Sequence, residues 1–275
     1  MNALTEHELL QALSKIGISS GDILLVHSDL RGFRIPAQTK TRNDILQFYY
    51  DTFEKILGKE GTLAVPAYFY EYARFGLPFD VDKSPVSDPL GSFSQWFINL
   101  PQRVRSCNPL QSIAAVGKHA HELSGSNSLS GYGVTSPWHK LRKLKGKIVF
   151  LGAPVQSMTY VHYVEQHYGV PHLYFKIYPY PVIKKGKELS THTISAVRYL
   201  DYAITYDLAA YKQQLEKEGV LHTHHVQGVP ISAVDAEAAY QIGISQLDQN
   251  PYFFLKQPPQ FIPGKIPTDG ITGPS

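Results

Sequence analysis

The sequence predicts an α/β fold whose C-terminal half is more antiparallel than its N-terminal half. Three observations support this. In the first 150 residues, amphipathic helical segments alternate with short apolar runs that are typical of buried strands. After residue 165, β-type runs are joined by Lys184-Lys185-Gly186-Lys187, which is typical of a hairpin turn. Hydrophobic residues make up 43% of the 275-residue chain, enough for a full core.

The N-terminal elements follow from local signals. Thr5, with Glu8 three residues later, forms a capping-box pattern that opens a helix over residues 5–16. Further helices are expected over 42–57 and 136–144, the last with Pro137 in its first turn. Buried strands are expected at 23–27, 62–66 and 147–151.

The second half of the chain has a different pattern. Residues 174–183 and 189–200 read as strands, and two amphipathic helices are expected over 207–217 and 233–248. The aromatic segment 69–90 is longer than a connector requires, and long loops often carry function. The last residues, 264–275, have the composition of a tail.

Composition excludes several classes of protein. Twenty-six Lys and Arg against 23 Asp and Glu give a net charge of +3, much less than nucleic-acid-binding proteins usually carry. No apolar run approaches the ~20 residues that span a bilayer, and the N-terminus lacks the pattern of a signal peptide. We therefore expect a cytoplasmic protein with no nucleic-acid partner and no membrane span. The single cysteine, Cys107, permits neither an internal disulfide nor a cysteine-based zinc site.

One short motif can carry acid–base chemistry. Thr159-x-x-His162-x-x-Glu165 places His162 and Glu165 on one face of a helix. Histidine has the side-chain pKa nearest to physiological pH, so His162 is the candidate general base. Its carboxylate partner is Glu165, Asp201 or Asp207, and spacing does not choose among them. The competing interpretation is a structural histidine on a buried helix face.

The same segment is a poor metal site. Zinc-binding helices place ligands four residues apart, but Gln166 occupies that position after His162, and His167 lies well round the helix. We therefore predict no metal. A second histidine cluster, at residues 222–225, reads more simply as a polar loop or edge strand.

Several motifs occur in an order that resembles the aminoglycoside 3-N-acetyltransferase family. The motifs are Gly21-Asp22 with Val26-His27-Ser28, Gly61-Thr62-Leu63 with Val65-Pro66, Arg105-Ser106 with Pro109 and Ser112, Ala115 and Gly117, Gly133 with Ser136-Pro137, Gly146-Lys147 with Leu151-Gly152, and Thr159, His162 and Glu165. Ordered agreement over residues 5–170 is more specific than any single pattern. The resemblance implies the α/β/α layered sandwich of the antibiotic N-acetyltransferase type, and transfer of an acyl group from acyl-CoA to the amine of an amino sugar.

The resemblance also suggests how the chain is divided. Residues 1–170 are expected to form the CoA-binding and catalytic region, and residues 171–263 to complete the acceptor site. Polar groups at strand ends can hold a pantetheine amide or a phosphate. The cofactor-binding candidates are His27, Ser28, Asp29, Leu30, Arg105, Ser106 and Ser112. The substrate-binding candidates are Tyr68, Asn108 and Thr159.

Two positions depart from the family pattern. The family typically reads Arg-Ser-x-His-Pro where this chain has Asn108, and His-Ser-Ser-Leu where it has Asp29. Asn108 indicates an acceptor or acyl pocket that differs from that of drug-modifying members, and Asp29 exchanges a hydroxyl donor for a carboxylate acceptor. At Ser28 and Asp29 a turn or helix cap is the simpler interpretation. Cys107, in the same segment as Asn108, is an alternative covalent acyl carrier, but direct transfer is expected.

The expected acceptor is a nucleotide-linked amino deoxysugar, dTDP- or UDP-bound, of the kind used for surface polysaccharides. A net basic, tyrosine-rich chain suits such an anion better than a polycationic aminoglycoside. The alternatives are an aminoglycoside 3-N-acetyltransferase that confers antibiotic resistance and a non-catalytic CoA-binding homologue. Acetyl-CoA is the expected donor, a longer acyl-CoA the alternative. A homodimer is expected because twofold pairs are the commonest assemblies.

Overall fold

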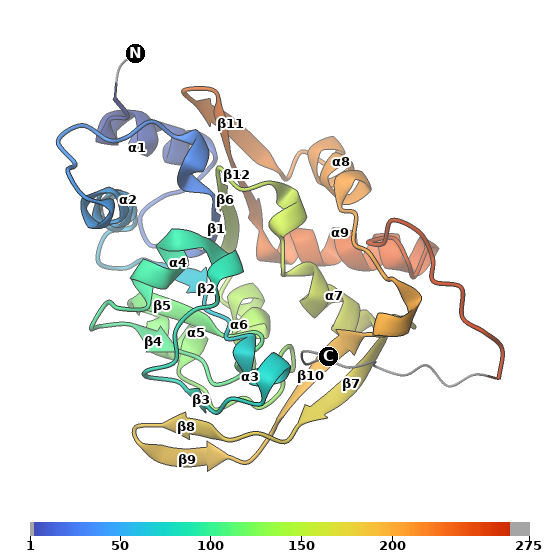
Figure 1. Cartoon of the computed structure of the whole chain (residues 1–275). Helices are drawn as coiled ribbons and strands as arrows, with labels where there is room; N and C mark the ends of the chain where they lie inside the picture. Colours follow the sequence, from blue (N-terminus) through green and yellow to red (C-terminus); the bar gives the residue numbers. More distant parts are fainter. Residues whose placement is uncertain (1–2, 265–275) are drawn as a thin grey trace.

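The computed structural model describes residues 3–264, and its centre is a mixed seven-stranded sheet (Figure 1). The strands run in the order β11-β12-β6-β1-β2-β5-β4. β1 pairs in parallel with β2 and β6, whereas the other four strand pairings are antiparallel. The strands are β1 (Ile23–Ser28), β2 (Thr62–Pro66), β4 (Val104–Arg105), β5 (Ile113–Gly117), β6 (Lys147–Leu151), β11 (His222–Val226) and β12 (Val229–Asp235).

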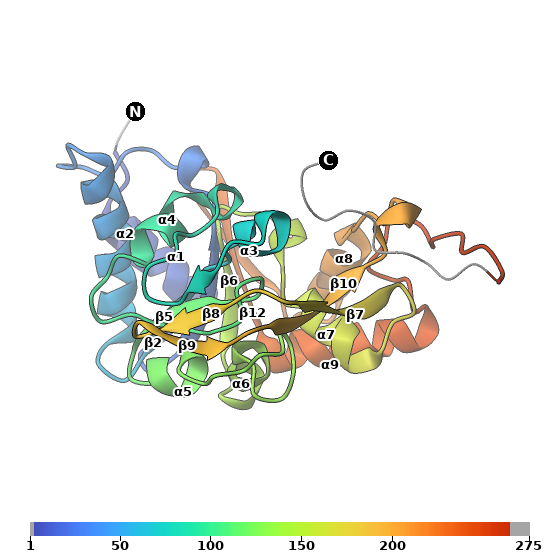
Figure 2. The same cartoon turned by 60° about the horizontal axis from the view of Figure 1, so that its bottom comes forward.

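Helices cover both faces of this sheet, which gives three layers (Figures 1 and 2). Leu24 and Val26 of β1 belong to one core, and Ile23 and Leu25 to the other, because neighbouring side chains of a strand point to opposite faces. The first core contains residues of α1 (Glu6–Lys15), α2 (Arg42–Leu57) and α4 (Gly91–Phe97). The second contains residues of α5 (Ala120–Ser124), α6 (Pro137–Lys143), α7 (Val161–Tyr168), α8 (Ala209–Lys217) and α9 (Ala236–Gln249).

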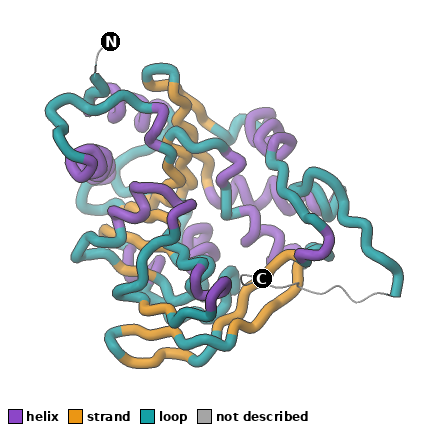
Figure 3. Tube along the Cα trace, viewed as in Figure 1, coloured by secondary structure: helices purple, strands orange, loops and turns teal. Residues whose placement is uncertain are grey.

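Two smaller sheets lie along one side of the central sheet (Figure 3). β7 (Leu173–Tyr178) pairs antiparallel with β10 (Thr193–Arg198). β8 (Val182–Lys184) lies between β3 (Phe79–Asp80) and β9 (Lys187–Ser190), and the β8–β9 connection is the predicted hairpin. The mixed α/β prediction with a more antiparallel C-terminal half is thus confirmed.

The predicted continuous strands 174–183 and 189–200 are wrong in extent, because each run is divided between two sheets. Pro179 and Pro181 interrupt the first run, since proline has no N–H for a strand ladder. In the second run, the Ser190 hydroxyl donates to the carbonyl of His192 and accepts from its backbone N–H. These local bonds replace strand pairing.

The remaining element predictions differ from the structure mainly at their ends. The capping box between Thr5 and Glu8 is formed, and β6 has the predicted bounds. α9 begins at Ala236 instead of residue 233, because residues 231–235 pair with β6 in the sheet.

Segment 69–90 is not a plain loop: it contains α3 (Glu71–Phe75) and β3. Of the predicted tail, residues 265–275 lie outside the described residues. No helix within residues 3–264 has the length and apolar composition needed to cross a membrane.

Candidate active site

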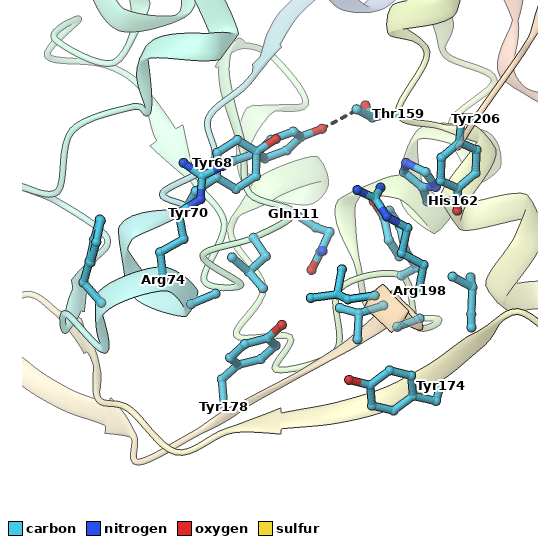
Figure 4. A pocket seen from close by; sticks show the side chains of 18 residues that line it. Tyr68, Tyr70, Arg74, Gln111, Thr159, His162, Tyr174, Tyr178, Arg198 and Tyr206 are labelled. Carbon is cyan, nitrogen blue, oxygen red and sulfur yellow. Dashed lines mark hydrogen bonds between the residues drawn. The ribbon is translucent and has the colours of Figure 1, made fainter. Parts of the chain in front are cut away.

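A cavity of about 620 Å³ lies between the segment after β2, the start of α7 and the β7–β10 sheet (Figure 4). Three of the predicted site residues, Tyr68, Thr159 and His162, line it. They come from two segments 91 residues apart, and the Tyr68 hydroxyl joins the segments by donating to Thr159 Oγ1 at 2.8 Å. The donated bond leaves the Thr159 hydroxyl proton available to a further acceptor.

His162 and Glu165 form the predicted pair on one face of α7. His162 Nδ1 lies 2.9 Å from Glu165 Oε2. The His162 side chain is 32% exposed, whereas that of Glu165 is fully buried. Because Nδ1 donates to the carboxylate, Nε2 is the nitrogen left with a free lone pair, as a general base requires.

Two further side chains hold the Glu165 carboxylate. His172 Nε2 lies 2.9 Å from Oε1, and the Tyr206 hydroxyl donates to Oε2 at 3.0 Å. Burial acts to raise the pKa of Glu165, but the hydrogen bonds from His162 and His172 outweigh it and hold that pKa below its ordinary value. The carboxylate is therefore ionised at neutral pH.

The geometry selects among the three predicted carboxylate partners of His162. Glu165 makes the contact. Asp201 is exposed on the turn Leu200–Tyr202, and Asp207 Oδ1 accepts the backbone N–H of Ala209, the first residue of α8. Sequence reasoning missed His172 and Tyr206. Neither residue shares a helix or strand with His162, so no periodic spacing indicates the contact. His172 follows α7 in a short loop, and Tyr206 lies 41 residues after Glu165.

None of the seven predicted cofactor-binding residues lines the cavity. The ring of His27 is buried and stacks on Phe150 with centroids 5.7 Å apart, and burial lowers its pKa to about 4. Ser28 ends β1 half-buried. Asp29 accepts the backbone N–H and the guanidinium of Arg31, so it caps the turn that begins at Leu30. Asp29 is therefore a cap, which is the simpler of its two predicted roles.

The predicted residues 105–112 hold a buried framework next to the cavity. The Arg105 guanidinium donates to the carbonyls of Ala67, Ser84 and Pro85, so its donors are used within the protein. Ser112 Oγ also donates to the Ala67 carbonyl, and Ser106 Oγ accepts from a backbone N–H. These contacts hold the chain segment that leads from β2 to Tyr68.

Asn108 is likewise fully engaged. Its side-chain N–H groups donate to the carbonyls of Leu129 and Ile194, and its oxygen accepts from Leu110 N–H. Asn108 does not line the cavity, but its neighbours Leu110 and Gln111 do. The residue that replaces the family histidine therefore positions part of the cavity wall.

Cys107 is buried outside the cavity lining, and burial raises the pKa of its thiol. A raised pKa disfavours the thiolate that a covalent acyl carrier needs.

The aromatic residues of segment 69–90 divide into two groups. Tyr70 and Phe75 line the cavity, whereas Tyr72 and Phe79 belong to a small hydrophobic core.

Comparison with known proteins identifies the family. The family described as Aminoglycoside 3-N-acetyltransferase matches residues 25–248, which is most of the chain. The chain belongs to this family. Membership places it among the N-acetyltransferases and confirms the resemblance that the ordered motifs predicted.

Curated relatives in this family include proteins that are 23–29% identical to the chain over the aligned segments. Aminoglycoside N(3)-acetyltransferase III of Pseudomonas aeruginosa is 29% identical over 67% of this chain and 72% of its own length. Aminoglycoside N(3)-acetyltransferase IV of a Salmonella species is 28% identical over 91% of this chain and 90% of its own length.

Solved structures agree with the fold of this family member. A mutant of aminoglycoside acetyltransferase AAC(3)-IVa in complex with a gentamicin superposes with a TM-score of 0.78, at 24% identity over 94% of this chain and 93% of that chain. The binary complex of AAC-IIIb with CoASH gives 0.77 at 22% identity, over 94% of this chain and 100% of that chain. These similarities confirm the layered α/β architecture.

Proposed function

We propose that this chain transfers the acetyl group of acetyl-CoA to the amine of an amino sugar by direct attack, with His162 as general base. The observation that supports this most is the His162–Glu165 pair at the cavity wall, with Glu165 ionised and fully buried. Family membership supplies the reaction class, and the complex of AAC-IIIb with CoASH supports a CoA thioester as the acetyl donor. Catalytic turnover sets this proposal apart from a CoA-binding homologue that has lost activity.

The proposed proton path starts at Nε2 of His162. The free amine of the acceptor attacks the thioester carbonyl, and Nε2 removes the proton that the nitrogen must lose. Glu165 stabilises the imidazolium that forms, because its carboxylate already accepts the Nδ1 proton. Collapse of the tetrahedral intermediate breaks the C–S bond, and His162 returns the proton to the sulfur of CoA. The products are the acetamide and CoASH.

Thr159 is the proposed donor to the oxyanion of that intermediate. Its hydroxyl lines the cavity one helical turn before His162 and already accepts a hydrogen bond from Tyr68. The Thr159 proton is thus directed away from Tyr68 and can meet developing negative charge on the thioester oxygen. Burial raises the pKa of Tyr68 well above 10, so Tyr68 stays a neutral donor.

The two regions of the chain contribute different parts of the proposed site. The acceptor side is assigned to residues 171–263, because β7, β10 and Tyr206 line the cavity opposite Tyr68. The proposed CoA segment, residues 27–30 at the end of β1, lies outside the lining of this cavity. This segment is closely packed: Gly152 has φ +69°, and an added Cβ would lie 2.3 Å from the carbonyl oxygen of Asp29. Gly152 therefore allows the backbone after β1 and the backbone after β6 to approach.

The acceptor class has two candidates. The relatives described above are aminoglycoside acetyltransferases, which favours an aminoglycoside as acceptor. They give no support to the nucleotide-linked amino deoxysugar that net charge favoured. The charged side chains of the cavity, Arg74 and Arg198, favour this second candidate.

The experiment that tests the proposed reaction is thiol release from acetyl-CoA with the purified full chain. Kanamycin, gentamicin and dTDP- and UDP-linked amino sugars serve as acceptors, and mass spectrometry of the product locates the added acetyl group. Thiol release coupled to an acetylated amine is the expected result. Binding of acetyl-CoA without transfer to any amine would contradict the proposal and favour a non-catalytic homologue.

A further inference from the structure

All formally charged residues in the cavity lining are cationic. Among residues 3–264, the lining contains Arg74 and Arg198 but no aspartate or glutamate. The carboxylate of Glu165 lies behind the wall, fully buried, and accepts three hydrogen bonds from side chains. The described lining of the cavity therefore offers an ammonium group no exposed carboxylate partner.

Neither cavity guanidinium is neutralised by the described part of the protein. Within residues 3–264, no hydrogen bond or ion pair holds the guanidinium of Arg74 or Arg198, and both residues are exposed. Arg74 only stacks over the ring of Tyr70, 5.4 Å from its centroid. By contrast, Arg142 outside the cavity pairs with Glu237 at 2.6 Å. Unpaired guanidinium groups in a cavity are suited to phosphate or carboxylate ligands.

The two arginines come from different elements. Arg74 lies on α3 and Arg198 ends β10, and Figure 4 shows them on opposite sides of the cavity. Tyrosine side chains line the same cavity, among them Tyr70 beside Arg74 and Tyr174 and Tyr178 on β7. Aromatic rings stack on sugar and base rings and discriminate little between them. The cavity therefore combines anion-binding groups with ring-binding surfaces.

A polycationic aminoglycoside is a poor match for this charge pattern. Its several ammonium groups would meet two guanidinium groups and no free carboxylate, and like charges brought together in a cleft oppose binding. An acceptor with one amine and one or two phosphates matches the same groups.

We propose that the acceptor is an amino deoxysugar linked to a nucleoside diphosphate, with its phosphates held by Arg74 and Arg198 and its amine at His162. This proposal rests on acetyl transfer at His162 and specifies the acceptor for that reaction. The shared chemistry is a phosphate-bearing amino sugar, and the nucleoside adds the ring for the tyrosine surface.

The test is binding of a dTDP-linked amino deoxysugar to the full chain saturated with CoASH, measured by calorimetry. Arg74→Gln and Arg198→Gln are each expected to weaken binding about tenfold or more, as loss of a charged hydrogen bond does. Arg198→Lys keeps the charge and should restore most of the binding. Lys217→Gln is the matched control, because it removes one positive charge from an exposed position on α8 outside the cavity lining.

Several outcomes overturn the proposal. Tighter binding of kanamycin than of the nucleotide-linked sugar, or unchanged binding in both glutamine variants, would exclude the phosphate role. A rise in KM for acetyl-CoA without a change for the acceptor would assign the guanidinium groups to the phosphates of CoA. If the sugar 1-phosphate binds as tightly as the nucleotide-linked sugar, the nucleoside assignment is wrong. Arginine-dependent binding without thiol release for any amine would overturn the proposed reaction and leave the acceptor class supported.

Discussion

Nδ1 of His162 lies 2.9 Å from Oε2 of Glu165, and this contact joins the partly exposed ring at the cavity wall to a carboxylate in the core. The chain contains a second pair with the same spacing. His119 Nδ1 lies 2.9 Å from Glu122 Oε2, but both of these side chains are substantially exposed. What distinguishes the His162 pair is therefore the burial of its carboxylate and the two additional donors to it.

Glu165→Gln tests the carboxylate. A neutral amide cannot stabilise an imidazolium and offers one oxygen where two now accept hydrogen bonds, so His162 loses its orientation. We expect kcat to fall about 10²- to 10⁴-fold in the thiol-release assay. Glu122→Gln, in the exposed His119 pair, is the control and should leave kcat unchanged. Equal kcat in the two variants would refute a role for Glu165.

Tyr206→Phe tests the third donor to Glu165. Burial and the neighbouring carboxylate raise the pKa of Tyr206 well above 10, so its hydroxyl remains a donor at neutral pH. Without this bond the pKa of Glu165 should rise. We expect about tenfold lower kcat and an acid limb of the kcat/KM profile that moves to higher pH.

The control for Tyr206→Phe is Tyr202→Phe, because the buried Tyr202 hydroxyl has no hydrogen-bond partner within residues 3–264 and lies outside the cavity lining. A purely structural role for Tyr206 predicts a lower melting temperature with an unshifted pH profile.

Thr159→Val tests the proposed oxyanion donor. Valine has nearly the shape of threonine but no hydroxyl, so kcat is expected to fall about 10²-fold while KM for acetyl-CoA changes little. Thr159→Ser retains the hydroxyl and should retain most of the activity. An active valine variant would require a different donor.

His27 predicts a pH dependence of stability that is separate from catalysis. In the unfolded chain a histidine titrates near 6.5, whereas burial lowers the pKa of His27 to about 4 in the fold. Between these values the unfolded chain binds more protons than the folded chain. The contribution of His27 to the free energy of unfolding is therefore fully present above pH 6.5 and is lost as the pH falls toward 4. The loss attributable to His27 between pH 7.5 and 5 is about 2 kcal/mol.

The measurement for His27 is urea unfolding at both pH values for the wild type and His27→Phe. The phenyl ring replaces the imidazole in its stack on Phe150 without a titrating group. The variant should lose about 2 kcal/mol less than the wild type on acidification. The same loss in both proteins would show that His27 is not the titrating group.

Local patterns predicted much of the fold and two of the four residues of the candidate site around Glu165. Apolar runs such as 147–151 indicated the central strands, and one helical turn joined His162 to Glu165. Tyr206 and His172 were missed because tertiary folding brings them to Glu165. The strand-end residues His27 and Asp29 were chosen for their chemistry, but in the fold His27 is buried and Asp29 caps a turn. Burial and local hydrogen bonding are not visible in spacing alone.

The central claim is that His162 removes the proton of the attacking amine, and the most direct measurement is kcat for thiol release by His162→Ala. His121→Ala, at an exposed position on α5, serves as the matched control. We predict a loss of about 10²- to 10⁴-fold for His162→Ala, with acetyl-CoA binding preserved and the control unchanged. A kcat within about threefold of wild type, in a folded variant that binds acetyl-CoA, would contradict the claim.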